Sequence, residues 1–518
     1  MDTKRWTLIA VILGSGVVFL ESSIVAVALP KIGEDLSSTL LETLEAQSYI
    51  YYAYLLSLSS LLILAGALTD YHGRKRMFLL GLAGFGTTSI LCGVAPNMEF
   101  LIAARVLQGA AGAMLVPGSL AIITATFEGE EQGRAFGVWA GASAATTILG
   151  PVVGGALVAY ISWRAAFLVS VPVIAFAAWV TARYMAETRD EESSGRFDFV
   201  GAAIVALSIG GLTFGTIRGQ AQEWQGVAPY VALAVGAVSM IAFPIVMRRS
   251  DHPLVPLDLF KSRNFTVTNI STLLIYGALY VFVQFLALYS IGVLGYNEIG
   301  FGIATIPTTV FLALFSTRFG ALAARYGPRR FMTLGPVVLA LGLLWLTRIP
   351  SHSAAWRPDV ADLSTFVPST GYLTDVLPAL VVFGIGLMIM VAPLTTALMR
   401  SVPVRNSGVA SAFNNAISRV GPQLAGALIF VFISTTFYAS LNDELPNEAT
   451  PRVREQVSPL NPPPADADPA LHKAAAEAST DAFHVAMLIA AGMCLTGAAV
   501  NGLGIIDPAA AQDTTAGA

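Results

Sequence analysis

The chain has 518 residues, of which 55% are hydrophobic and only 12% are charged. Soluble domains carry about 25% charged residues, so this composition excludes an ordinary globular protein and indicates a membrane protein. A net charge of −4 gives no reason to expect nucleic-acid binding. Cys92 and Cys494 both lie in apolar runs, which predicts buried thiols rather than a disulfide framework.

The apolar residues form runs that are long enough to cross a hydrocarbon core of ~30 Å at ~1.5 Å per residue. In chain order we expect fourteen spans, at about 6–30, 46–69, 77–95, 99–126, 134–160, 165–186, 198–217, 228–247, 265–291, 299–324, 331–349, 375–399, 407–433 and 481–504. The first run imitates a signal peptide, but it is longer than a usual signal core and contains Glu21. The sequence therefore predicts an all-α membrane protein with fourteen transmembrane helices.

The cations predict the orientation of these spans. Of the 29 Lys and Arg residues, eighteen fall on the side of the 70–76 loop, eight on the opposite side and three within spans. Because cytoplasmic loops carry an excess of cations, we expect both termini to lie in the cytoplasm, with the chain in the plasma or inner membrane.

One loop of the chain occurs twice. Residues 66–76 read GALTDYHGRKR and residues 320–330 read GALAARYGPRR, so that five of eleven positions agree and Ala324 stands where Asp70 would be. The copies follow spans 2 and 10 on the same side, which indicates two parallel six-span repeats with two inserted spans. We divide the chain into an N-terminal bundle (1–190), an inserted two-helix segment (191–255) and a C-terminal bundle (256–518) with a long extracytoplasmic loop at 434–480.

The first loop, G-x-L-x-D-x-x-G-R-K-R, resembles the signature loop of the major facilitator superfamily. The arrangement of six, two and six spans is similar to the 14-spanner drug:proton antiporters of that superfamily. The resemblance implies that the loop is a conformational latch formed by Gly66, Asp70, Gly73, Arg74 and Lys75. From the residues alone, Asp70 can pair with Arg74 or face the N-terminus of a neighbouring helix. A topology-fixing basic loop with an incidental Asp is the alternative.

Two ionisable residues lie within spans at similar depth. Glu21 is roughly 13 Å and Arg105 roughly 10 Å inside the outer ends of spans 1 and 4, where ionisable groups are costly and are functional candidates. They can pair, each offsetting the desolvation of the other. Segment 20–30 resembles the span 1 signature of the drug:proton antiporters, which usually have Asp where Glu21 stands, and segment 101–112 resembles the span 4 signature of the superfamily. We expect the two to couple protons to transport; a structural ion pair is the alternative.

Small residues in span 5 form the sequence Gly150-Pro151-Val152-Val153-Gly154-Gly155. Such spacing lets helices approach closely, which is the plain interpretation. The motif also resembles the signature of antiporters rather than symporters of the superfamily, which favours export.

Polar residues on two later spans are candidates for a substrate pocket. Tyr276, Tyr280 and Gln284 recur every four residues on one face of span 9, although helix packing explains the tyrosines equally well. Span 13 adds Asn414, Asn415 and Arg419, and Arg419 near mid-depth needs a partner or a water-filled cavity. The external segments 350–374 and 434–480 are interpreted as flexible or partly helical connectors, with residues 469–482 able to form a helix. A binding role for either segment is the alternative.

Other chemistries lack their sequence signals. No lysine follows a glycine, so the chain has no P-loop, and no H-E-x-x-H occurs. We therefore expect no enzyme activity, no cofactor and no metal site. The sequence predicts a monomeric, proton-coupled transporter that works by alternating access and exports amphipathic or cationic small molecules. The alternatives are a dedicated exporter of one metabolite or lipid, an uptake symporter, and a receptor or scaffold without transport.

Overall fold

The structure is a computed structural model that describes residues 3–37, 43–188, 198–221, 226–359, 362–445, 457–463 and 467–507. Within these ranges it is helical, and the only extended pairing is a single bridge between Asp359 and Asp362. The first helices are α1 (Thr3–Asp35), α2 (Thr43–His72), α3 (Arg74–Gly93), α4 (Met98–Thr126), α5 (Gly129–Tyr160), α6 (Trp163–Leu168) and α7 (Ser170–Tyr184). They are followed by α8 (Phe199–Ala221), α9 (Ala228–Arg249), α10 (Arg263–Leu288), α11 (Glu298–Tyr326), α12 (Arg329–Leu346), α13 (Leu377–Arg400), α14 (Ser407–Glu444) and α16 (Pro469–Gly504).

The expected all-helical membrane architecture is confirmed. Among the described residues, 13 helical segments are long and apolar enough to cross a membrane, and α6 and α7 together form one of them. The predicted span at 134–160 corresponds to α5, which is 32 residues long and is not among these 13. The chain is therefore an integral membrane protein.

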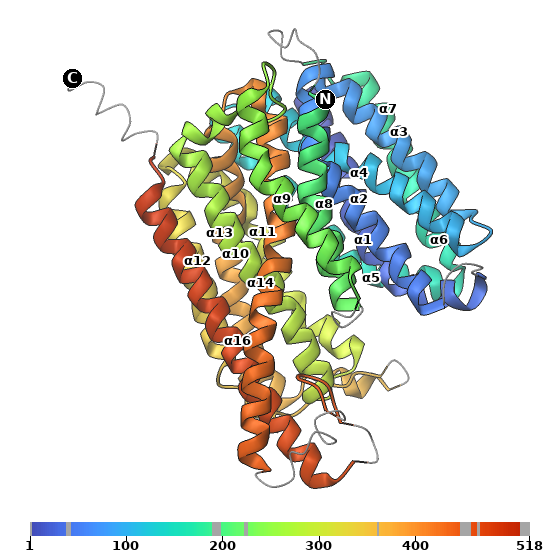
Figure 1. The fold of residues 1–518 in the computed structure, drawn as a ribbon, viewed down its shortest axis with the longest axis vertical. Coiled ribbons are helices and arrows are strands. Elements are labelled where there is room, and N and C mark those ends of the chain that lie inside the picture. Colours follow the sequence, from blue (N-terminus) through green and yellow to red (C-terminus); the bar gives the residue numbers. More distant parts are fainter. Residues whose placement is uncertain are drawn as a thin grey trace.

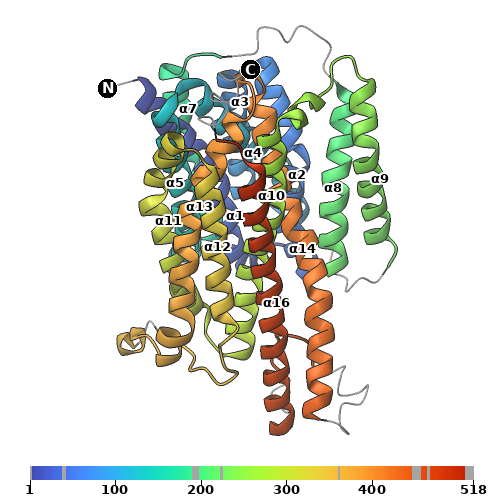
Figure 2. The same ribbon diagram turned by 90° about the vertical axis from the view of Figure 1, so that its left-hand side faces the viewer.

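Two helix bundles lie side by side, and α1 begins at the same end of the molecule where α16 ends (Figure 1). The bundles contact each other chiefly through α5 with α11 and through α2 with α14. Helices α8 and α9 pack against each other, and α8 also contacts α2 and α14 at the side of the bundles (Figure 2). The domain boundaries at 190 and 255 stay a prediction, and residues 189–197 of the connecting segment lie outside the described residues.

The bundles meet most closely where the first glycine of each repeated loop lies. A side chain on Gly66 of α2 would overlap the carbonyl oxygen of Gly408 on α14, and one on Gly320 of α11 would overlap that of Gly133 on α5. Only a residue without a side chain lets the backbones approach this far. The latch end, defined as the end that carries the α2–α3 turn, is therefore closed.

Elsewhere each bundle has an apolar core of its own. The core that contains Phe78 and Leu115 continues from the N-terminal bundle into residues 398–420 of the C-terminal bundle. By contrast, the core around Ile24 and Phe167 contains buried residues of the N-terminal bundle only. The core around Phe383 contains buried residues of the C-terminal bundle only.

Two helices extend far beyond a bilayer at the end opposite the latch end (Figure 2). At ~1.5 Å per residue, the 38 residues of α14 and the 36 residues of α16 measure about 57 and 54 Å, against a core of ~30 Å. The stretch 469–482 is thus the first part of α16, whereas residues 446–456 and 464–466 of the predicted loop lie outside the described residues.

The external segment 350–374 is folded against the C-terminal bundle. Trp356 packs on Tyr372 with ring centroids 4.8 Å apart. The hydroxyl and backbone N–H of Ser364 donate to Asp362, which lowers the pKa of that carboxyl group. This connector is partly helical, as expected, with short turns at Leu363–Phe366 and Tyr372–Val376.

Candidate functional site

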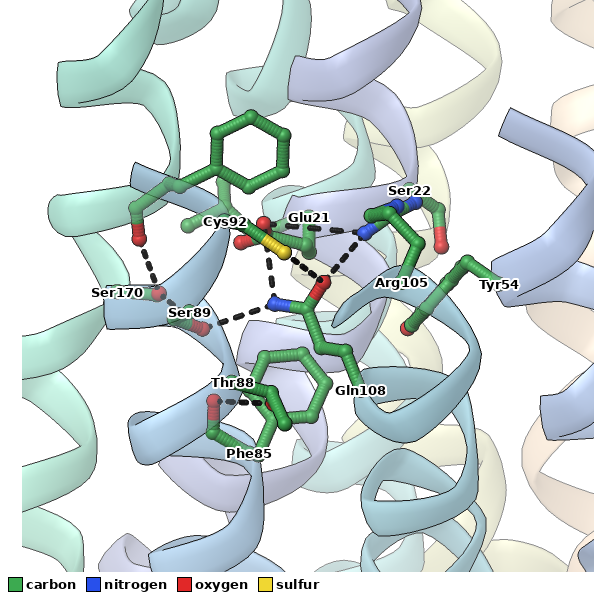
Figure 3. Close-up of polar contacts among 12 residues, drawn as sticks. Glu21, Ser22, Tyr54, Phe85, Thr88, Ser89, Cys92, Arg105, Gln108 and Ser170 are labelled. Carbon is green, nitrogen blue, oxygen red and sulfur yellow. Dashed lines mark hydrogen bonds and ion pairs between the residues drawn. The ribbon is translucent and has the colours of Figure 1, made fainter. Parts of the chain in front are cut away.

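Glu21 of α1 and Arg105 of α4 lie together inside the N-terminal bundle (Figure 3). Both side chains are fully buried, and Arg105 Nη1 lies 3.9 Å from Glu21 Oε1. This distance is longer than that of a direct charge-assisted hydrogen bond. The two charges therefore attract each other without direct hydrogen bonding.

Gln108 lies between the two charged groups (Figure 3). Its carbonyl oxygen accepts a hydrogen bond from Arg105 Nη1 at 2.6 Å. Its amide nitrogen donates to Glu21 Oε1 at 3.2 Å and to Ser89 Oγ at 2.8 Å. The sequence analysis missed Gln108, although an amide three residues after Arg105 on the same helix face was the available signal.

Arg105 is held from two further sides. Its Nε donates to the carbonyl oxygen of Ile50 at 3.1 Å, and its guanidinium carbon lies 4.1 Å from the centre of the Tyr54 ring. Tyr54 in turn donates to the carbonyl oxygen of Val18 at 3.0 Å. Within the described residues, Glu21 Oε2 and Arg105 Nη2 are buried without a hydrogen-bond partner. Because unmet buried groups are costly, this pair has capacity for a proton or a water molecule.

The sixth span is irregular beside this pair. Pro172, the third residue of α7, lacks a backbone N–H, so one helical hydrogen bond is missing where α6 passes into α7, although Val169 keeps helical backbone angles. Ser170, the first residue of α7, donates to the carbonyl oxygen of Phe167 and lies 3.2 Å from Ser89 Oγ. The irregularity therefore lies beside Ser89, which Gln108 joins to the buried acid.

The small-residue motif of α5 packs against the helix that carries Glu21. A side chain on Gly150 would overlap Ser23, two residues from Glu21, and one on Gly154 would crowd Ile24. Gly155 faces Val27 more loosely. The side chain of Pro151 lies outside the described residues. The motif thus fixes the packing of α5 on α1 at the depth of the buried acid.

The predicted latch connects the two bundles. Asp70 lies 3.3 Å from Arg74 Nη2 and accepts hydrogen bonds from the backbone N–H groups of Gly408 at 3.1 Å and Val409 at 2.9 Å. Arg74 also donates to Ser407 Oγ at 3.1 Å. Both contacts expected for Asp70, with Arg74 and with a helix N-terminus, are therefore present.

Glu187, which follows α7, organises the rest of this loop. Gly73 has a φ angle of 105°, which favours glycine, and a side chain there would overlap the Glu187 carboxylate. The backbone N–H groups of Lys75 and Arg76 donate to Glu187 at 3.0 and 3.2 Å, and Lys75 Nζ donates to the carbonyl oxygen of Ala182. Glu187 therefore caps the N-terminus of α3.

The predicted pocket residues lie in different surroundings. Asn414 donates to Asn269 and Thr272 of α10 at 3.0 and 2.8 Å, so it joins two helices of one bundle. Asn415 donates to the carbonyl oxygen of Ser411 on its own helix. The rings of Tyr276 and Tyr280 lie 6.4 Å apart, and Tyr280 and Gln284 are exposed. A substrate role for these residues stays a prediction.

Comparison with known proteins identifies the family. The model for the Major Facilitator Superfamily matches residues 11–426. The chain belongs to the Major Facilitator Superfamily. Several members of this superfamily match nearly the whole chain. Multidrug resistance protein Stp of Mycobacterium tuberculosis is 30% identical over 464 residues, which cover 88% of this chain and 81% of Stp.

Two further members are named for export of drugs or antibiotics. Multidrug efflux pump LfrA of Mycolicibacterium smegmatis is 30% identical over 451 residues, with coverages of 87% and 84%. The tetracenomycin C resistance and export protein of Streptomyces glaucescens is 28% identical over 451 residues, with coverages of 87% and 80%. The crystal structure of the human organic anion transporter MFSD10 shares the fold, with a TM-score of 0.59 and 14% identity over 97% of this chain and 100% of that chain.

In the described part of the chain, no group of three His, Cys, Asp or Glu residues is arranged to hold a metal ion.

Proposed function

We propose that this protein is a proton-coupled secondary transporter that exports amphipathic small molecules by alternating access. The fully buried pair of Glu21 and Arg105 carries the proposal, because an ionisable pair inside a membrane bundle marks an ion or substrate pathway. The superfamily membership and the drug-exporting relatives support export as the direction. A receptor or scaffold needs neither this pair nor a breakable contact between bundles.

A change in protonation of Glu21 alters the forces on three helices. The ionised carboxylate attracts Arg105 of α4 and accepts a hydrogen bond from Gln108. Protonation cancels the charge and leaves Arg105 with its contacts to Gln108, Ile50 and the Tyr54 ring. Because α1 also packs on α5, which contacts the other bundle, this change can bias the interface between the bundles.

The latch end is the cytoplasmic end in this proposal, and the protein lies in the inner membrane and works as a monomer without a cofactor. The cation count supports this orientation. With the latch end closed, the structure then represents an outward-facing state. A cysteine at the exposed Asn461 should react with an impermeant thiol reagent on intact cells, whereas one at the exposed Asp251 should react only after the membrane is opened. The reverse pattern would overturn the orientation.

The function itself is tested in proteoliposomes that contain the purified protein. A pH gradient, acidic on the side opposite the latch end, is imposed while a panel of fluorescent amphipathic dyes is screened. We expect at least one dye to move against its own gradient toward the acidic side, and the movement to stop when nigericin collapses the pH gradient. Dye movement that is the same with and without the pH gradient would contradict proton coupling.

A further inference from the structure

Arg419 is an intramembrane cation that the proposed coupling site does not use. It lies on α14 and is half-buried. No carboxylate among the described residues lies within salt-bridge distance of its guanidinium group, whereas Arg105 has Glu21. A cation at this depth needs a partner or a water-filled cavity, and the described residues supply no anionic partner.

The register of the helices shows what surrounds Arg419. Helices α2 and α14 run in opposite directions, and Gly66 packs against Gly408 and Ala412. Arg419 lies seven residues beyond Ala412, or about 10 Å further from the latch end. This places it opposite residues 55–59 of α2, within reach of the turn that carries Tyr51 and Tyr54. Both tyrosines lie close enough to Arg419 for its charge to act on them.

Helix α10, which runs parallel to α14, forms the third side of the surroundings of Arg419. Asn414 donates to Thr272, so Arg419, five residues further on, is level with residue 277. Tyr276 and Tyr280 lie on either side of this level, and Tyr280 lies near Tyr51 of the other bundle. Tyr280 is 52% exposed. The register of the three helices therefore places one guanidinium group and two aromatic side chains near one another between the bundles.

We propose that Arg419, Tyr51 and Tyr280 form the substrate site and that this site takes an aromatic anion. A guanidinium group pairs with a carboxylate or sulfonate through two parallel hydrogen bonds, and the tyrosines supply aromatic contact area. This inference rests on the proposed function and narrows its substrate class. It departs from the expectation of cationic substrates, because a cation would meet an unpaired guanidinium group here.

The test uses two dyes that share a xanthene ring system but differ in charge. Fluorescein is the anionic probe and rhodamine 123 the cationic one, and binding to the purified full-length protein is followed by fluorescence anisotropy. The parent should bind fluorescein more tightly than rhodamine 123. Arg419→Gln should weaken fluorescein binding at least tenfold and leave rhodamine 123 binding unchanged or stronger. Arg419→Lys, which keeps the charge, should retain more fluorescein affinity than Arg419→Gln.

Arg318→Gln is the matched control, because Arg318 is an exposed arginine within a span of the same bundle and lies over the Phe315 ring. It should bind both dyes like the parent. The proposal is overturned if Arg419→Gln binds fluorescein as the parent does, if the parent prefers rhodamine 123, or if Arg419→Gln loses both dyes while keeping the unfolding temperature of the parent.

Transport separates this inference from the proposed function. If a pH gradient drives rhodamine 123 but not fluorescein out of proteoliposomes, the anion site is wrong and proton-coupled export stands. If fluorescein binds through Arg419 but no dye of the panel moves in response to the gradient, the site stands as a binding site and the proposed function fails.

Discussion

The two copies of the repeated loop have the same backbone contacts but different charges. Gly66 and Gly320 both bring their helix against the opposite bundle. In the first copy, Asp70 binds the N-terminus of α14. In the second copy, Ala324 has no side-chain charge, and its carbonyl oxygen accepts a hydrogen bond from Arg400, which also donates to the carbonyl oxygen of Gly129.

In both copies, the helix that follows the loop is capped by an acidic residue from a distant part of the sequence. Glu187, three residues after α7, accepts backbone hydrogen bonds at the start of α3. Asp507, three residues after α16, accepts one from Arg329 at the start of α12, next to Gly327 with a φ angle of 87°. The caps and glycine contacts are thus the common scaffold of both bundles. Only the α2–α14 interface has in addition a carboxylate, that of Asp70, which joins the two bundles. We therefore expect this interface to be the regulated one.

The largest effect on closure of the latch end is expected at the contact of Gly320 between α11 and α5, where no acidic residue adds to the glycine packing. Gly320→Leu inserts a side chain where the backbones of α11 and α5 touch. Overpacking costs about 1–3 kcal/mol, so the population closed at the latch end should fall by roughly 5- to 150-fold. Spin labels on cysteines at the exposed Glu130 and Arg330 report the separation directly. An unchanged distance distribution would show that this contact does not hold the end closed.

A comparable effect is expected for Asp70→Asn. The substitution removes the negative charge that faces the N-terminus of α14, and hydrogen bonds to charged groups contribute about 1.5–3 kcal/mol. Transport should slow by roughly tenfold or more, while substrate affinity stays within a few-fold of the parent. Asp251→Asn, at an exposed acid in the α9–α10 connection, is the control. Lost affinity with normal turnover would instead place Asp70 in the substrate site.

The smallest effects are expected for the two acidic helix caps, and the loss of stability should be similar in the two bundles. Glu187→Gln and Asp507→Asn each weaken a helix cap, which costs about 0.5–2 kcal/mol. Both should lower the unfolding temperature of the purified protein by similar amounts and change transport little. A transport defect confined to Glu187→Gln would mean that this residue belongs to the latch rather than to the shared scaffold.

The features that follow from local sequence were predicted, and those that depend on distant partners were not. Hydropathy was enough to predict the spans, and the sequence of the loop was enough to predict the kinds of contact that Asp70 makes. The position of Gln108, three residues after Arg105, marks it as a candidate, but its bridging role depends on how α1, α3 and α4 meet. The cap at Glu187 joins residues more than 100 positions apart, so no local pattern reveals it. The irregularity at Val169 followed from Pro172, a signal that the apolar run concealed.

The central claim is that Glu21 couples protons to transport, and Glu21→Gln tests it most directly. This variant keeps the size of the side chain and removes the ionisable group. In proteoliposomes under an imposed pH gradient, it should fail to concentrate a dye that the parent concentrates, while still exchanging that dye at equilibrium. Glu131→Gln, an exposed carboxylate paired with Lys4, should behave like the parent. If Glu21→Gln still concentrates the dye against its gradient, the account is contradicted.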